Sequence, residues 1–267
     1  MKNLSNYILE AKNRNLDIDR RQPKSRSELE MIISGAFNRK QYDLNFIDTS
    51  KITDMSELFE GVKHNFDVSS WDVSNVKDMS KMFSRCYAFT GKGLENWDVS
   101  NVTDMSHMFD SCSIFIGKGL ENWDVSNVTN MYSMFLHCKK FDCDLSNWDM
   151  SNVIDTSLMF SNCAKFTGKG IENWNVSKVK SMYAMFGDCT NFNCDVSNWD
   201  VSNVTDMDSM FVNCKKFTGK GLENWNVSKV KTMRTMFNGC KFNYHELDWD
   251  LSGLSSQLKT FRNYLAD

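Results

Sequence analysis

Residues 94–112 read LENWDVSNVTDMSHMFDSC, and close copies of this stretch recur along most of the chain. Tryptophan marks each copy, at positions 71, 97, 123, 148, 174, 199, 225 and 249, with 24 to 26 residues between neighbours. A Phe follows each Trp by 12 residues, and a Cys follows seven of them by 15. Ile47 takes the place of Trp in one further unit, with Met55, Leu58 and Phe59 in the matching places, which gives nine units. A period of this length is typical of repeat proteins.

A strand with its tryptophan inside the protein is expected at the start of each unit. Trp97 and Val99 alternate with Asp98 and Ser100, and this period of two predicts a short half-buried strand. The alternative is an exposed row of indole rings that stacks against sugars. That arrangement would move the Asp and Ser residues into the core, where an unpaired charge costs several kcal/mol. We therefore expect a buried column of tryptophans beside an exposed polar column.

An apolar stripe follows the strand. Met105, Met108, Phe109 and Cys112 stand at positions i, i+3, i+4 and i+7, which is the spacing of one helix face. The residue just before this stripe is of a helix N-cap type in all nine units. These residues are Asp54, Asp78, Asp104, Asn130, Asp155, Ser181, Asp206, Thr232 and Ser256. The pattern predicts a helix in every unit.

Stacking of such units predicts an α/β repeat fold. We expect a leucine-rich-repeat-like solenoid, with nine units of about 25 residues, a face of parallel strands and a face of helices. Gly-Lys-Gly connections occur at residues 91–93, 117–119, 168–170 and 219–221, and from Trp148 onward they alternate with shorter connections at a step of 51 residues. This alternation indicates that pairs of units were duplicated together.

Three regions are predicted along the chain. They are an N-terminal helical cap and basic connector at 1–46, leucine-rich-like repeats at 47–248, and a degenerate C-terminal capping repeat at 249–267. Within the first region, residues 25–37 predict a helix that begins at Ser25 or Ser27 and covers the first unit, with Leu29, Ile32, Ile33 and Phe37 on one face. A second helix is expected near residues 3–15.

The repeated unit NWDVSNVTDMSxMFxxC, with the lead-in DLNFIDTSKITDMSELF at residues 43–59, resembles the BspA-like, mycoplasma-lipoprotein-type leucine-rich repeats. The resemblance covers about residues 24–267. Proteins of this family are mostly predicted bacterial surface proteins. The resemblance therefore implies a leucine-rich repeat fold and a role at a cell surface.

Composition and the ends of the chain bear on partners and location. With 31 Lys and Arg against 34 Asp and Glu, the net charge is -3, so the basic excess typical of nucleic-acid-binding proteins is absent. No apolar run reaches the length of a membrane span. The N-terminal stretch MKNLSNYILEAKNRNLD lacks the apolar core of a secretion signal. We expect a cytoplasmic protein, with the bacterial cell surface or secretion as the alternative.

Catalysis is not expected. Repeats place the same residues in every unit, whereas an enzyme needs an asymmetric cluster of acid, base or nucleophile. The nine cysteines form no C-x-x-C pair, and the four histidines are not at zinc-binding spacing from them. Seven of these cysteines lie on the apolar stripe, where a reduced, buried thiol is expected. His245-Glu246 is the one unusual local pair, and we expect it to be solvated. We expect no enzyme activity, no metal and no cofactor.

The exposed strand positions are the candidate binding site, which we expect on the concave face of the solenoid. The candidate residues are Asn96, Asp98, Ser100, Asn122, Asp124, Ser126, Asn147, Asp149, Ser151, Asn173, Asn175, Asn198 and Asp200. Neighbouring Asn, Lys and backbone groups could simply offset the stacked Asp charges. Alternatively, the row is a surface that receives another macromolecule, a protein rather than a nucleic acid. The second interpretation favours a non-enzymatic scaffold that binds another protein. An exported adhesin and a self-assembling structural protein are the alternatives.

Overall fold

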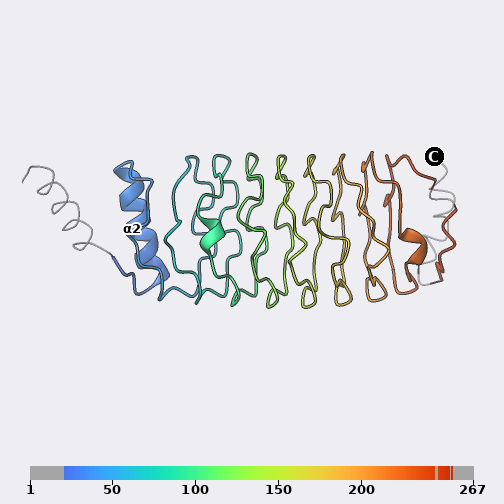
Figure 1. The fold of residues 1–267 in the computed structure, drawn as a ribbon, viewed down its shortest axis with the longest axis horizontal. Helices are drawn as coiled ribbons and strands as arrows, with labels where there is room; N and C mark the ends of the chain where they lie inside the picture. Colours follow the sequence, from blue (N-terminus) through green and yellow to red (C-terminus); the bar gives the residue numbers. More distant parts are fainter. Residues whose placement is uncertain (1–20, 244–245, 253, 255–267) are drawn as a thin grey trace, which may run out of the picture.

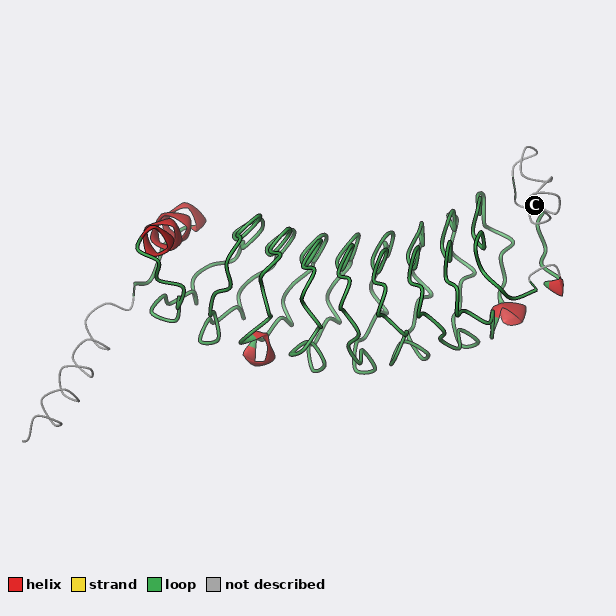
Figure 2. Cartoon of the chain, turned by 90° about the horizontal axis from the view of Figure 1, so that it is seen from above, coloured by secondary structure: helices red, strands yellow, loops and turns green. Residues whose placement is uncertain are grey.

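The chain winds into coils that stack along one long axis (Figure 1). The computed structural model describes residues 21–243, 246–252 and 254. Parallel bridges join neighbouring coils at equivalent positions, from Asp54 with Asp78 to Asp206 with Thr232. The stack bends, so that one long side is concave and the opposite side is convex (Figure 2).

Helices are few among the described residues. They are one α-helix, α2 at Arg26–Asn38, and two 3-10 helices, η1 at Leu94–Asn96 and η2 at Leu222–Asn224. The predicted N-terminal helix is confirmed in α2, and its N-cap is Ser25, whose hydroxyl oxygen accepts a hydrogen bond from the Glu28 N–H at 3.2 Å. Leu29, Ile33 and Ala36 are buried in the common hydrophobic core, so α2 covers the start of the stack. No described helix is long and apolar enough to cross a membrane.

The apolar stripe does not form the predicted helices. Residues 106–111 run as consecutive turns, with His107 at φ 55° and Ser111 at φ 62°. The N–H of His107 donates to the carbonyl of Tyr132 in the next coil at 2.8 Å, and the Phe109 N–H donates to Met134 at 2.9 Å. The backbone N–H groups that would form hydrogen bonds within a helix therefore form them with the neighbouring coil.

The spacing of the coils explains this difference. The rings of Phe109 and Phe135 are equivalent residues of the stripe in adjacent coils, and their centroids are 5.7 Å apart. An α-helix with its side chains is about 10 Å wide. A helix in every coil would not fit at this spacing, whereas stacked turns do.

The position of the parallel pairing also differs from the prediction. Seven of the nine bridges between described residues join Asp54, Asp78, Asp104 and their equivalents rather than the tryptophan segment. The other two, Arg21 with Ile47 and Asp43 with Asp67, lie at the start of the stack. The side chain of Asp104 does cap a local structure, but it is a turn, because its Oδ1 accepts from the N–H of Ser106 at 2.8 Å. Seven of the nine predicted helix N-caps, from Asp54 to Asp206, therefore cap turns, and Ser256 lies outside the described residues.

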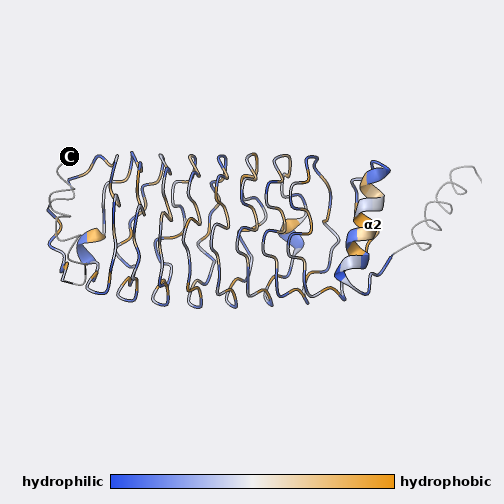
Figure 3. Ribbon diagram, turned by 180° about the vertical axis from the view of Figure 1, so that it is seen from behind, coloured by the Kyte–Doolittle hydropathy of each residue, from blue (hydrophilic) through white to orange (hydrophobic). Residues whose placement is uncertain are grey.

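The core is a set of stacked columns, one per repeated apolar position. Trp97 is 5% exposed and Trp123 is 3% exposed, and their rings stack at 6.4 Å. Each indole N–H is satisfied inside the core, as when Trp123 donates to the carbonyl of Leu94 at 2.9 Å. Hydrophobic and hydrophilic residues alternate along the coils (Figure 3). The tryptophans are thus buried, as the period of two predicted.

Three predicted features lie partly or wholly outside the described residues. The helix expected near residues 3–15 lies outside them, as does His245 of the His245-Glu246 pair. Of the C-terminal capping repeat, residues 249–252 and 254 are described, and Trp249 and Leu254 are buried there.

Candidate functional site

The residue that follows each tryptophan is an exposed turn cap. Asp98 Oδ1 accepts a hydrogen bond from the N–H of Ser100 at 3.1 Å. The same bond recurs in every coil that has a tryptophan, and we call these side chains the Asp/Asn row. The row consists of Asp72, Asp98, Asp124, Asp149, Asn175, Asp200, Asn226 and Asp250. Each bond fixes one oxygen of the side chain.

The turn also favours the charged form of the aspartates. Hydrogen bonds from Ser126 hold the pKa of Asp124 below its ordinary value. Those from Ser202 do the same for the pKa of Asp200. Asp124 and Asp200 are therefore charged at neutral pH, and the hydrogen bonds from Ser126 and Ser202 offset part of that charge.

Asparagine side chains link the row from coil to coil. Asn101 Nδ2 donates to the carbonyl of Ser74 in the preceding coil at 2.8 Å. Asn75, Asn127, Asn152 and Asn203 make the equivalent bond. These bonds hold successive turns in register.

Lysine replaces this asparagine in two coils. Lys178 Nζ donates to Asn152 Oδ1 at 2.6 Å, and Lys229 Nζ donates to Asn203 Oδ1 at 2.8 Å. The same coils carry Asn175 and Asn226 in the Asp/Asn row. The negative charge of the row is therefore interrupted at these two coils.

The candidate residues that precede the tryptophans form a second, looser column. Asn198 Nδ2 lies 2.9 Å from Asn173 Oδ1, and Asn147 Nδ2 lies 3.5 Å from Asn122 Oδ1. Asn96 instead donates to the carbonyl of Ser69. The structure brings these asparagines together in pairs of coils.

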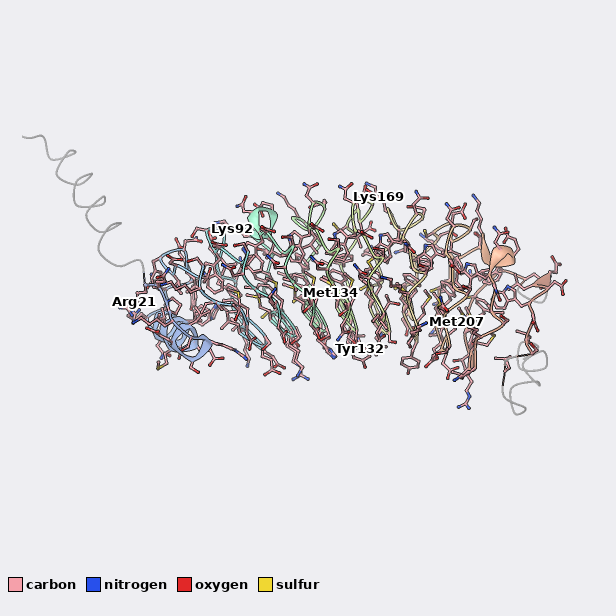
Figure 4. All side chains as sticks on the ribbon, turned by 90° about the horizontal axis from the view of Figure 1, so that it is seen from below. Arg21, Lys92, Tyr132, Met134, Lys169 and Met207 are labelled. Atoms are coloured by element: carbon pink, nitrogen blue, oxygen red, sulfur yellow. The ribbon has the colours of Figure 1, made fainter. Side chains whose placement is uncertain are left out.

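The 3-10 helices that precede two of the tryptophans lie on the side opposite to the concave face where the site was expected (Figure 2). Asn96 is the last residue of η1, and η1 and η2 lie on the convex side of the stack (Figure 2). Figure 4 shows Lys92 and Lys169 on one long edge and Tyr132 near the opposite edge. The sequence period shows which residues share a column, but it does not show which way the stack bends.

Ion pairs between coils at the Gly-Lys-Gly connections were not predicted. Lys169 Nζ lies 3.0 Å from Asp144 Oδ2, and Lys220 Nζ lies 2.7 Å from Asp195 Oδ2. Lys92 pairs with Asp67 in the same way. The sequence contained a signal for these ion pairs. In each case the preceding coil has a shorter connection, and that connection supplies the Asp that pairs with the lysine.

The cysteine column is inert. Cys138 and Cys163 are buried free thiols, and burial raises the pKa of both. Cys138 Sγ donates to the carbonyl of Phe109 at 2.9 Å. Within the described ranges, no group of three or more His, Cys, Asp or Glu side chains is arranged to hold a metal ion.

Repeated coils with capped polar turns and a continuous aromatic core define a repeat protein. Four overlapping segments of the chain, residues 2–93, 27–115, 87–170 and 159–266, match the family described as "Mycoplasma protein of unknown function, DUF285". Together the segments cover nearly the whole chain, so the protein belongs to this family. No curated protein matches it.

Proposed function

We propose that this chain is a non-enzymatic scaffold that binds another protein along the Asp/Asn row. The observation that carries the proposal is the turn cap, in which Asp98 Oδ1 accepts from Ser100 while the side chain stays exposed. The second carboxylate oxygen is left for a partner, and it is held in a fixed direction. Preorganised groups bind more tightly because less conformational freedom is lost on binding.

The charge and spacing of the row indicate the kind of partner. Asp72, Asp98, Asp124 and Asp149 lie in four consecutive coils, about 4.8 Å apart if the spacing is that of neighbouring strands. Rows of like charge attract segments of the opposite charge and speed their association. The partner expected here is a protein segment rich in lysine or arginine.

We also propose that the stack is a variant of the BspA-like leucine-rich-repeat solenoid. The repeat period and the parallel coils support this relationship. The absence of repeat helices among the described coils distinguishes the variant. A surface adhesin of that family remains the alternative setting for the same binding function.

The test uses an isosteric change. The triple variant Asp98→Asn, Asp124→Asn and Asp149→Asn removes three charges but keeps the Oδ1 acceptor, as Asn175 does naturally. Binding of a labelled lysine-rich peptide is measured by fluorescence anisotropy at low salt. Exposed ion pairs contribute up to about 1 kcal/mol each, so Kd should rise on the order of tenfold or more.

The matched control removes three charges from side chains outside the Asp/Asn row. Glu95, Glu121 and Glu223 each accept a hydrogen bond from a Gly N–H, and the Glu→Gln changes keep that acceptor. The control variant should bind the peptide like the wild type. Equal weakening by both variants, or no binding by the wild type, would count against the Asp/Asn row as the site.

A further inference from the structure

A second exposed surface follows the turns between the cysteine column and the next phenylalanine column. We call it the Cys–Phe ridge. It comprises residues 87–88, 113–114, 139–140, 164–165, 190–191, 215–216 and 241, and in each coil also the residue that follows the phenylalanine at the end of the turn, as Ile116 follows Phe115. Both flanking columns are stacked: Cys138 Sγ donates to the Phe109 carbonyl, and the rings of Phe115 and Phe141 are 6.3 Å apart. The turns between them therefore form one continuous edge of the stack.

One part of the ridge is basic. Its lysines are Lys139, Lys140, Lys165, Lys215, Lys216 and Lys241, and all six are exposed. Lys92, Lys169 and Lys220 are held in ion pairs. Within the described residues, by contrast, no side chain of the six ridge lysines forms an ion pair or a hydrogen bond. Their charge is available to a ligand.

The part of the ridge nearer the N-terminus is apolar. Tyr87 is 53% exposed, Ile114 is 38% exposed and Ile116 is 51% exposed. The Ile116 carbonyl accepts from the N–H of Asp142 at 3.3 Å, which places Ile116 directly beside the first lysine-bearing coil. Exposed apolar side chains that gather on one edge mark an interaction site more often than scattered ones do.

We propose that the Cys–Phe ridge docks on an anionic lipid surface. The lysines would lie against lipid phosphates, and Tyr87, Ile114 and Ile116 would enter the interface between headgroups and acyl chains. Anionic lipid attracts lysines near the bilayer surface, and exposed apolar side chains add contacts that salt does not screen. This surface is separate from the Asp/Asn row, so either proposal can fail alone.

The form of the ridge favours lipid over a protein segment or a nucleic acid. Short turns project single side chains and offer no open strand edge, because backbone groups such as the Asp142 N–H already bond to the neighbouring coil. An extended peptide gains most of its affinity from such an edge or from a groove. Single-stranded nucleic acid uses several aromatic rings for base stacking, whereas Tyr87 is the one exposed aromatic ring on the described ridge.

The experiment is flotation of the full chain with vesicles. Vesicles of phosphatidylcholine mixed with phosphatidylglycerol are compared with vesicles of phosphatidylcholine alone. The wild type should float with the anionic vesicles only. The variant Lys139→Glu, Lys140→Glu and Lys165→Glu should reduce the bound fraction at least tenfold, and Tyr87→Ser, Ile114→Ser and Ile116→Ser should remove the binding that survives raised salt.

The matched control is Lys77→Glu, Lys180→Glu and Lys231→Glu, which makes the same charge change at exposed lysines off the ridge. Its vesicle binding should equal that of the wild type, and circular dichroism should show all variants folded. Loss of binding in the control to the same extent would overturn the proposal. So would absence of wild-type binding at low salt, or equally tight binding of polyglutamate or a DNA oligonucleotide.

Discussion

Lys169 and Asp144 lie in adjacent coils, and the Nζ and Oδ2 atoms of the two residues are 3.0 Å apart. The same pairing occurs between Lys220 and Asp195. Thr167 adds a second link between the two coils, because its N–H and its hydroxyl both donate to Asp142 Oδ1. Contacts of this kind join coils in pairs, which agrees with the 51-residue step of the sequence.

These ion pairs predict a contribution to acid stability. The hydrogen bond from Lys169 holds the pKa of Asp144 below its usual value, and that from Lys220 lowers the pKa of Asp195 from 3.8 to about 2. A carboxylate with a lowered pKa in the folded state stabilises the fold above the pKa of the unfolded state. This stabilisation is lost as pH falls through the folded pKa.

The measurement compares the wild type with the variant Asp144→Asn and Asp195→Asn, which keeps the turn acceptors for Ser146 and Ser197. At pH 7 the variant should melt at a lower temperature. The difference in melting temperature should shrink as the pH falls from about 4 to about 2. A difference that stays constant over this range would show that the ion pairs do not cause it.

Gly170 is predicted to be essential for close contact between paired coils. Its φ is +88°, and an added Cβ would lie 2.5 Å from Asp144 Oδ1 and from the Ser146 N atom. Gly170→Ala should therefore destabilise the protein through both backbone strain and a clash, by roughly 2–4 kcal/mol. Urea denaturation measures this loss.

Two other glycines separate these causes. Gly61 has φ +74° but nothing within 4 Å of an added Cβ, so Gly61→Ala should cost only the strain. Gly35 lies inside α2, where Ala is the better helix former, and Gly35→Ala should stabilise by up to about 1 kcal/mol. Equal losses at Gly170 and Gly61 would contradict the close-contact explanation.

The residues that form the core could be predicted from the sequence, but the local structure of half of each coil could not. The tryptophan, methionine, phenylalanine and cysteine columns repeat with the coil, so their burial follows from stacking. The spacing of Met105, Met108 and Phe109 suits a helix, but turns in which the backbone reverses every few residues bury the same side chains. The positive φ values at His107 and Ser111 are those of turns rather than of a helix. The residue types His and Ser do not predict a positive φ.

Part of the geometry of the candidate site also could not be predicted from the sequence. The Asp/Asn row was expected from the alternation around each tryptophan, and its side chains are exposed as that pattern predicted. Its hydrogen bonds to Ser residues depend on a turn at Asp98 to Ser100, where a strand was expected. No single repeated motif encodes the direction in which the stack bends.

The phenylalanine column is predicted to couple neighbouring coils. The ring of Phe160 lies 5.5 Å from that of Phe135 and 5.8 Å from that of Phe186, and all three are fully buried. Phe160→Ala should cost about 3–5 kcal/mol. The double variant with Phe186→Ala should cost less than the sum of the two single changes, because the contact between these rings is lost only once. Additive losses in urea denaturation would show that the rings act independently.

The buried thiols predict sensitivity to alkaline pH. Burial raises the pKa of the Cys86 thiol and of the Cys240 thiol from 9.0 to about 12. A raised pKa in the folded state means that the neutral thiol favours folding. This contribution is complete below pH 9 and is lost as the pH rises toward 12. The melting temperature should therefore fall above about pH 9, and replacing Cys163 by Ala should weaken this fall while lowering stability at pH 7.

Thiol reactivity provides the direct measurement. At pH 8 a thiol reagent should leave the buried Cys138, Cys163 and Cys189 unmodified in the folded protein, because the reactive species is the thiolate and burial disfavours it. Cys240 is partly exposed and should react first. All nine cysteines should react after denaturation in guanidinium chloride. Rapid modification of Cys163 in the folded state, located by mass spectrometry, would mean that the coils open readily.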